Sequence, residues 1–187
     1  GIQYAIKNNC RIISASLSDT VYNANVEQAI SNAYSRNQNS ILFVASGGNT
    51  NKEEYRYPSS YENVFGVSAV NFVSGQYVIG GSTRNNRLDI AAPSGSTSAA
   101  TAYAAGVAAL VFGADPTLSA AECAQIIMDT ATDAGAPGYD TSYGYGIINP
   151  LAAVQRAKLK QTSINRSISG VASSYSKKLS ARAFQLN

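Results

Sequence analysis

The sequence contains no histidine in 187 residues. Histidine is the usual general base for a serine or cysteine nucleophile and a common metal ligand, so either kind of site would need other residues here. Two cysteines are too few for a disulfide framework, and without histidine they form no cluster for a transition metal. We therefore expect no metal site and no cofactor, and we expect Cys10 and Cys123 to be small buried residues.

Charge and long apolar runs are also scarce. Charged residues make up 13% of the chain and apolar residues 45%, which suits a packed core and is too apolar for a disordered chain. No apolar run reaches the length of a membrane-spanning helix, so no transmembrane segment is expected. Residues 1–7 lack the cationic start and apolar stretch of a signal peptide. These residues have the pattern of a helix that starts before residue 1, which suggests that the chain was cut from something longer.

The last part of the sequence lacks acidic residues altogether. All eleven Asp and Glu lie within residues 1–150, whereas residues 151–187 hold seven of the fourteen Lys and Arg. We predict one partial α/β domain at 1–157 and a basic tail or linker at 158–187. The basic segment either connects to a further domain or contacts an anionic partner. Aromatic and basic residues do not interleave there, so nucleic-acid binding is not indicated.

Strand and helix patterns alternate along the domain. A helical face is predicted from Val26 to Tyr34, where apolar residues recur at helical spacing. Continuous apolar segments joined by helices indicate an open, mostly parallel sheet with helices on both faces. The four segments that read as buried strands are 11–17, 41–45, 64–70 and 88–91.

The helix predicted at 97–112 consists mostly of alanine, glycine and other small residues. Small side chains all round a helix allow close packing on every side, so we expect this helix to be central and buried. Asp115-Pro116 ends it, and Ser119 with Glu122 forms a capping-box pattern that begins another helix. A short terminal helix is expected to end near Ala157.

Two polar residues are placed where chemistry could occur. Ser98 lies in the first turn of the small-residue helix, where free N–H groups and a partial positive charge can stabilise an oxyanion. Asn49 follows the strand 41–45 through a Gly-Gly turn, at the carboxyl end of the sheet where sites of open α/β folds lie. Each has a plainer interpretation: Ser98 as a helix cap and Asn49 as a turn residue.

Six short motifs occur in a fixed order along residues 1–157. They are Ser16-Leu17-Ser18, Gly47-Gly48-Asn49, Tyr57-Pro58, Ala92-Pro93-Ser94, Ser96 to Gly106, and Gly144 to Ala153. This succession resembles the C-terminal part of the catalytic domain of the subtilisin-like serine proteases. The resemblance implies a subtilisin-like fold without its N-terminal strands, endopeptidase activity on peptide or protein substrates, and an extracellular location.

The same resemblance assigns roles to particular residues. It implies that Ser98 is the nucleophile and that the Asn49 amide belongs to the oxyanion hole. It also implies that Ser16, Leu17 and Ser18 form the strand edge that pairs with substrate, and that Ser46, Gly47 and Gly48 wall the pocket for the residue before the scissile bond. Tyr57-Pro58 corresponds to a position where the family often has a cis proline.

The chain departs from the family pattern in ways that bear on activity. The catalytic Asp and His of the family precede the matching region, and the motif positions of Pro and His are Ala102 and Tyr103. Pro93 and Ser98 are five positions apart, where relatives carry a long stretch. Lys7 and Lys52 stand in polar contexts, so neither is expected to replace the base.

Three hypotheses follow from these departures. The chain is an incomplete serine endopeptidase, inactive alone, or a non-catalytic pseudo-protease that acts as a scaffold or a peptide-binding module, or an unrelated α/β domain. In relatives, a further strand lies beside the one that matches 10–17. We therefore expect 10–17 to be an open edge that pairs with a complementary N-terminal fragment, drives self-association or makes the chain slow to fold.

Overall fold

The computed structural model describes residues 1–36 and 40–163. Its sheet contains β1 (Ile12–Ala15), β2 (Leu42–Ser46), β3 (Val64–Val73), β4 (Gln76–Ile79) and β5 (Ile90–Pro93). β1, β2, β3 and β5 run parallel in that spatial order, and β4 is an antiparallel partner of the far end of β3. The predicted mostly parallel α/β fold is confirmed.

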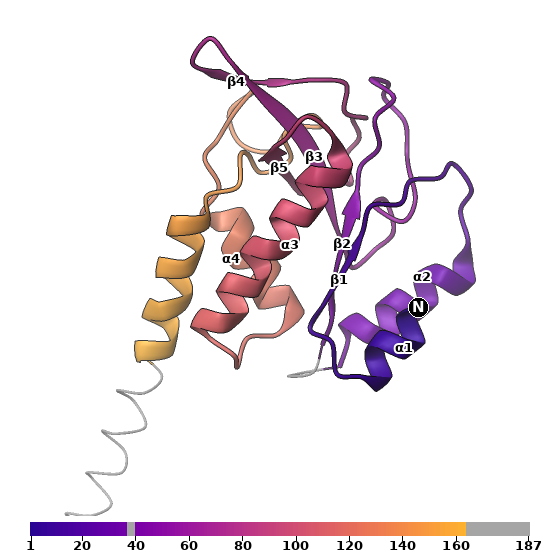
Figure 1. Ribbon diagram of the computed structural model, residues 1–187, viewed down its shortest axis with the longest axis vertical. Coiled ribbons are helices and arrows are strands. Elements are labelled where there is room, and N and C mark those ends of the chain that lie inside the picture. The colour runs from indigo at the N-terminus through magenta and orange to yellow at the C-terminus, as the bar shows by residue number, and fades with distance from the viewer. Residues whose placement is uncertain (37–39, 164–187) are drawn as a thin grey trace, which may run out of the picture.

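Helices cover both faces of the sheet (Figure 1). One face carries α3 (Thr97–Ala114) and α4 (Ala120–Asp129), and the other carries α1 (Ile2–Lys7) and α2 (Ala24–Tyr34). β2 is buried at every position, as its continuous apolar sequence predicts. The predicted capping box is present at the start of α4, where Ser119 and Glu122 each accept a backbone N–H of the other.

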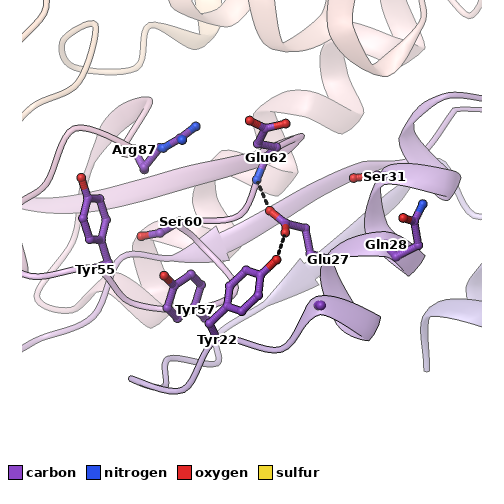
Figure 2. Close-up of a pocket in the computed structure, with 10 residues that line it drawn as sticks. Tyr22, Glu27, Gln28, Ser31, Tyr55, Tyr57, Ser60, Glu62 and Arg87 are labelled. Carbon is purple, nitrogen blue, oxygen red and sulfur yellow. Dashed lines mark hydrogen bonds between the residues drawn. The ribbon is translucent and has the colours of Figure 1, made fainter.

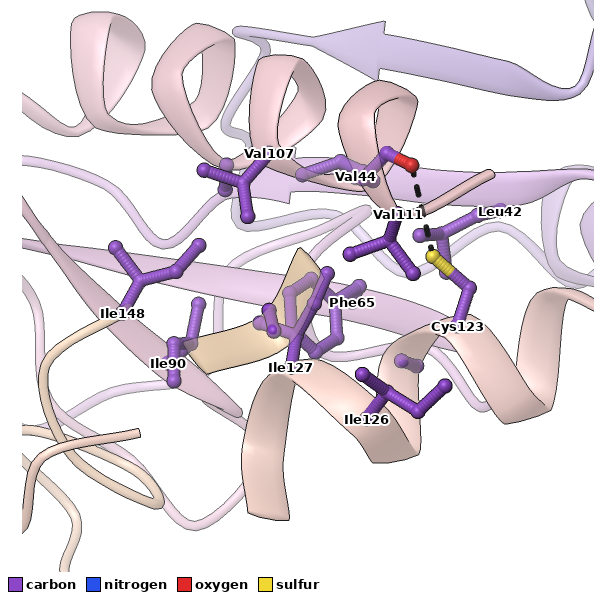
Figure 3. Close-up of a cluster of buried hydrophobic side chains, with 14 of the residues drawn as sticks. Leu42, Val44, Phe65, Ile90, Val107, Val111, Cys123, Ile126, Ile127 and Ile148 are labelled. Carbon is purple, nitrogen blue, oxygen red and sulfur yellow. Dashed lines mark hydrogen bonds between the residues drawn. The ribbon is translucent and has the colours of Figure 1, made fainter. Parts of the chain in front are cut away.

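The larger hydrophobic core lies between α3, α4 and the sheet (Figure 3). Val107 and Val111 of α3 face Leu42 and Val44 of β2, while Ile127 of α4 packs over Phe65. A smaller core on the other face holds α2 against β1 and β2.

The expectation that α3 is buried on every side is wrong. Its inner face is buried, but Tyr103 and Leu110 on the outer face are 42% and 58% exposed. Because the outer face also consists of small and apolar residues, composition alone did not distinguish the two faces. By length and composition α3 could cross a membrane, yet its inner face packs across the parallel strands as a core helix does.

The cysteines and the terminal helix also differ from expectation in part. Cys123 is buried as predicted, whereas Cys10 is exposed between α1 and β1. The last described helix runs from 150 to 163, beyond the predicted end near Ala157, and Lys160 forms an ion pair with Glu122 of α4. The rest of the predicted tail, 164–187, lies outside the described residues.

The two edges of the parallel sheet differ in their backbone hydrogen bonding. At the β5 edge, the Ala91 N–H donates to Gly146 O at 2.9 Å, and the Ala91 carbonyl accepts the Ile148 N–H at 2.9 Å. At the β1 edge, no strand among residues 1–36 and 40–163 pairs with the outer side. The strand predicted to form an open edge is therefore an edge in the structure.

Candidate functional site

The candidate site forms where three segments meet at the N-terminus of α3. β1 leads into Ser16, β2 leads through Gly47-Gly48 into Asn49, and β5 leads through residues 94–96 into Thr97. Ser96 is the N-cap of α3, and its hydroxyl accepts the Ala99 N–H at 3.4 Å. The carboxyl ends of these parallel strands lie at the same end of the sheet, so the residues that follow the strands lie close together there.

A clamp between Asn49 and Thr97 organises the site. Asn49 Oδ1 accepts the backbone N–H and the side-chain hydroxyl of Thr97, both at 2.9 Å. A backbone N–H can only donate, so the amide atom that it contacts is the oxygen. Asn49 Nδ2 is therefore the free end of the amide, and it has no acceptor among the described residues.

Ser98 follows Thr97 directly and lies in the first turn of α3. The first N–H groups of a helix have no acceptor within the helix, so the Ser98 N–H is available to a ligand. Ser98 is partly buried, and its carbonyl accepts the Ser16 hydroxyl at 3.0 Å. This bond ties the end of β1 to the start of α3.

The Gly47-Gly48 turn is required by close packing. A Cβ on Gly47 would lie 2.7 Å from Leu88 Cδ2, and Gly48 has a φ of +97°. Ser46, which precedes them, is buried, and its hydroxyl lies 2.7 Å from that of Thr97. Because the Thr97 hydroxyl donates to Asn49, Ser46 is the donor in this pair.

The residues singled out in the sequence thus divide into two groups. Ser16 bonds to the carbonyl of Ser98, while Ser46 and Asn49 both bond to Thr97, the residue directly before Ser98. Leu17 is 68% exposed on the surface, and Ser18 accepts a hydrogen bond from Arg56 at 3.0 Å. The Tyr57–Pro58 bond is cis.

Sequence reasoning missed two residues of this region. Thr97 was treated only as the neighbour of Ser98. Its position at the start of the predicted helix could have identified it, because the N–H of such a residue needs an acceptor outside the helix. Arg56 carried no recognised signal, because its contact with Ser18 joins residues 38 positions apart.

Two of the hollows in the described structure lie outside the Asn49–Thr97 clamp. A polar pocket of about 650 Å³ lies between α2 and residues 55–62, where Glu27 accepts hydrogen bonds from Tyr22 and from the Glu62 N–H (Figure 2). The bond from Tyr22, with that from Glu62, lowers the pKa of Glu27 below its usual value. A larger groove, about 820 Å³ in volume, begins at Leu17 and Ser18 and continues past Val26 and Phe43.

No group of three or more Cys, Asp and Glu side chains is placed to hold a metal ion within 1–36 and 40–163.

Comparison with known proteins supplies a family. The model of the subtilase family matches residues 1–146. A thermostable alkaline protease of Halalkalibacterium halodurans is 35% identical over 170 residues, which cover 83% of this chain and 45% of that protein. The minor extracellular protease Epr of Bacillus subtilis is 30% identical over 163 residues, which cover 79% of this chain and 25% of that protein.

A solved structure gives the same fold. Fervidolysin from Fervidobacterium pennivorans, described as a keratinolytic enzyme related to subtilisin, has a TM-score of 0.73 with this chain at 21% identity. The match covers 83% of this chain and 28% of that protein. The chain thus spans less than half the length of each of these three proteins.

Proposed function

The chain belongs to the subtilase family, and from this premise we propose that it supplies the nucleophile and the oxyanion-binding groups of a serine endopeptidase. Ser98 is the proposed nucleophile, and Asn49 Nδ2 and the Ser98 N–H are the proposed donors to the oxyanion. The observation that supports this most directly is the Asn49–Thr97 clamp, which fixes the amide oxygen beside Ser98 and leaves the amide nitrogen free. Substrates would be peptides or proteins, paired along Ser16, Leu17 and Ser18 and walled by Ser46, Gly47 and Gly48.

The reaction also requires a base that this sequence does not contain. A serine hydroxyl attacks a peptide carbonyl only when a neighbouring group accepts its proton, and such help contributes about 10²–10⁴-fold. The 187 residues include no histidine. We propose that the chain alone does not hydrolyse peptides, and that a segment outside it brings the base and the acid that orients it.

The open edge of β1 is the proposed docking site for that segment. The outer side of β1 has no partner strand among the described residues, and the groove of about 820 Å³ adjoins it at Leu17. An unpaired edge beside an apolar groove suits an extended apolar strand that adds parallel to β1. The end of such a strand would lie near Ser16, whose hydroxyl already bonds to Ser98 O.

A non-catalytic peptide-binding module is the second candidate. Only residues 94–96 link the end of β5 to the start of α3, and Tyr103 stands where the family motif has its histidine within the helix. In this alternative, the same groups bind a peptide carbonyl or carboxylate without cleaving a bond.

Labelling with a fluorophosphonate distinguishes the two candidates. We expect no labelling of the chain alone and stoichiometric labelling of Ser98 after addition of the N-terminal region of a related subtilase that contains the Asp and His. A Ser98→Ala variant is the control, because it retains the helix and loses only the hydroxyl. Labelling of the chain alone would contradict the need for an outside base. Failure of labelling despite stable association would favour the binding module.

We also propose an extracellular location, since one of the relatives is named as an extracellular protease. Detection of the protein in the culture medium rather than in washed cells would test this assignment.

A further inference from the structure

Arg56 lies beside the proposed peptide site in a rigid segment. Its N–H donates to Ser60 Oγ at 3.2 Å, and its carbonyl accepts from Ser60 N at 2.9 Å and from Ser59 Oγ at 2.8 Å. Ser59 and Ser60 are both buried. Both the backbone N–H and the backbone carbonyl of Arg56 are therefore fixed by hydrogen bonds, which sets the direction of its side chain.

The side chain spans the two segments proposed to hold the peptide. Arg56 Cγ lies 3.2 Å from the place where a Cβ of Gly48 would be, so the aliphatic stem covers the glycine turn. Arg56 Nε donates to Ser18 Oγ at 3.0 Å. Gly48 directly precedes Asn49, the residue that presents the free amide.

The guanidinium has more donors than the described residues satisfy. The side chain is 18% exposed, and Nη1 lies 3.5 Å from Glu54 Oε1. Nη2 has no acceptor among residues 1–36 and 40–163. A guanidinium carries five N–H donors in a planar fork that matches a carboxylate, and a largely buried one interacts most favourably with that group.

We propose that Arg56 makes the peptide site selective for an acidic side chain, Glu or Asp, in the residue whose carbonyl faces Asn49 and Ser98. This inference rests on the proposed function and specifies its substrate class. Glu54 is the competing carboxylate, and at 3.5 Å its contact with Nη1 is longer than a good charge-assisted hydrogen bond. A bidentate acidic side chain from the peptide would take its place.

Peptides that end in a free carboxylate test the proposal without hydrolysis, because that carboxylate can occupy the site of the oxyanion. We would use fluorescein-labelled Ala-Ala-Ala-X with X as Glu, Gln, Leu or Lys, and measure Kd with the 187-residue chain by fluorescence anisotropy. The Glu peptide is expected to bind about tenfold more tightly than the Gln peptide, and the Lys peptide most weakly.

Two variants separate the role of Arg56 from general effects on the site. Arg56→Gln should bring the Kd of the Glu peptide to that of the Gln peptide and leave the Gln and Leu peptides unchanged. Glu54→Gln should strengthen binding of the Glu peptide, since it removes the competing carboxylate. Unfolding curves of both variants identify any loss of binding that comes from misfolding.

The outcomes distinguish the two levels of the proposal. Peptide binding without a preference for Glu, or a preference that survives in Arg56→Gln, overturns the selectivity and leaves the proposed function intact. Failure of every peptide to bind, by contrast, overturns the proposed peptide site itself.

Discussion

The two edges of the parallel sheet differ in whether another described segment pairs with them. The β5 edge is closed by residues 144–148, which exchange backbone hydrogen bonds with Asp89 and Ala91 at 2.8–2.9 Å. The β1 edge has no partner strand among the described residues, and the exposed Leu17 continues from it. The candidate site lies between them, with its proposed donors in the turn after β2 and in the first turn of α3. The described residues thus hold the proposed oxyanion donors in place and leave unpaired the edge that we propose as the docking site of the base-bearing segment.

Gly144 offers the largest test of the closed edge. It has a φ of +63°, and an added Cβ would lie 2.4 Å from the backbone C and O of Asp89. Gly144→Ala should destabilise the fold by about 2–5 kcal/mol, because alanine disfavours this conformation and the neighbouring backbone must move. Urea denaturation measures the change.

Gly113→Ala is the matched control for that substitution. Gly113 lies near the end of α3 with no atom within 4 Å of an added Cβ. This variant should be neutral or up to about 1 kcal/mol more stable, since alanine favours a helix. Equal effects of the two variants would mean that residues 144–148 do not close the edge as tightly as their hydrogen bonds indicate.

Asp89 makes the closed edge sensitive to pH. Its Oδ2 accepts the Gly66 N–H at 2.7 Å, and burial raises the pKa of the carboxyl to about 7, against the opposing effect of that bond and of Arg87. An unfolded Asp has a pKa of about 4. Between about pH 4 and 7 the folded state therefore holds a proton that the unfolded state has lost.

Stability should consequently fall as pH rises through that range, by at most ~1.4 kcal/mol per pH unit, and level off above pH 7. Asp89→Asn keeps an acceptor for Gly66 and should remove this slope. Urea midpoints from pH 4 to 8 compare the two proteins. A slope that persists unchanged in the variant would assign it to another group.

Adjacent residues of α3 compare its buried and exposed faces. Val111 is fully buried in the larger core, whereas Leu110 is 58% exposed. Val111→Ala should lose about 2 kcal/mol of stability through lost burial and a small cavity. Leu110→Ala should change the stability of the chain alone by less than about 0.5 kcal/mol. Thermal unfolding of both variants distinguishes the faces, and a large loss for Leu110→Ala would show that the outer face is covered.

The parts of the fold that the sequence predicted are those governed by local patterns. Buried strands such as Leu42–Ser46 were found because their apolar residues are continuous, and the capping box at Ser119 because its spacing is fixed. β4 was missed, although Ser74-Gly75 before it has positive φ at both residues, as a tight hairpin turn requires. The one-sided burial of α3 could not be predicted, because it depends on which segments are present to cover the helix.

The candidate site was predictable to a similar extent. Ser98 and Asn49 were identified through their motifs, and the structure brings both to the start of α3. The Thr97 clamp joins residues 48 positions apart, and the Arg56 bond to Ser18 depends on the same tertiary arrangement. Their roles as nucleophile, oxyanion donor and selectivity residue stay predictions until labelling and binding are measured.

The open edge itself is tested by a substitution that should change the stability of the isolated chain only slightly. Leu42 N–H donates to Arg11 O, and in a strand alternate residues direct their backbone groups to opposite sides. The N–H of Ser14, three residues after Arg11, therefore faces the open edge and makes no bond to β2. Ser14 is exposed, so Ser14→Pro removes a donor without removing a ladder bond or a packed side chain.

We expect Ser14→Pro to lower the unfolding free energy of the isolated chain by less than about 1 kcal/mol. It should nevertheless weaken association with a complementary N-terminal region, because the added strand loses a backbone hydrogen bond and meets the proline ring. Ser14→Thr, which keeps the N–H and favours a strand, is the control and should bind as the parent does. Light scattering of the chain alone shows whether self-association through 10–17 occurs instead, in which case Ser14→Pro should yield a monomer. If the parent chain is already a monomer with amides along 10–17 protected from exchange, some part of the chain covers this edge, and the docking proposal fails.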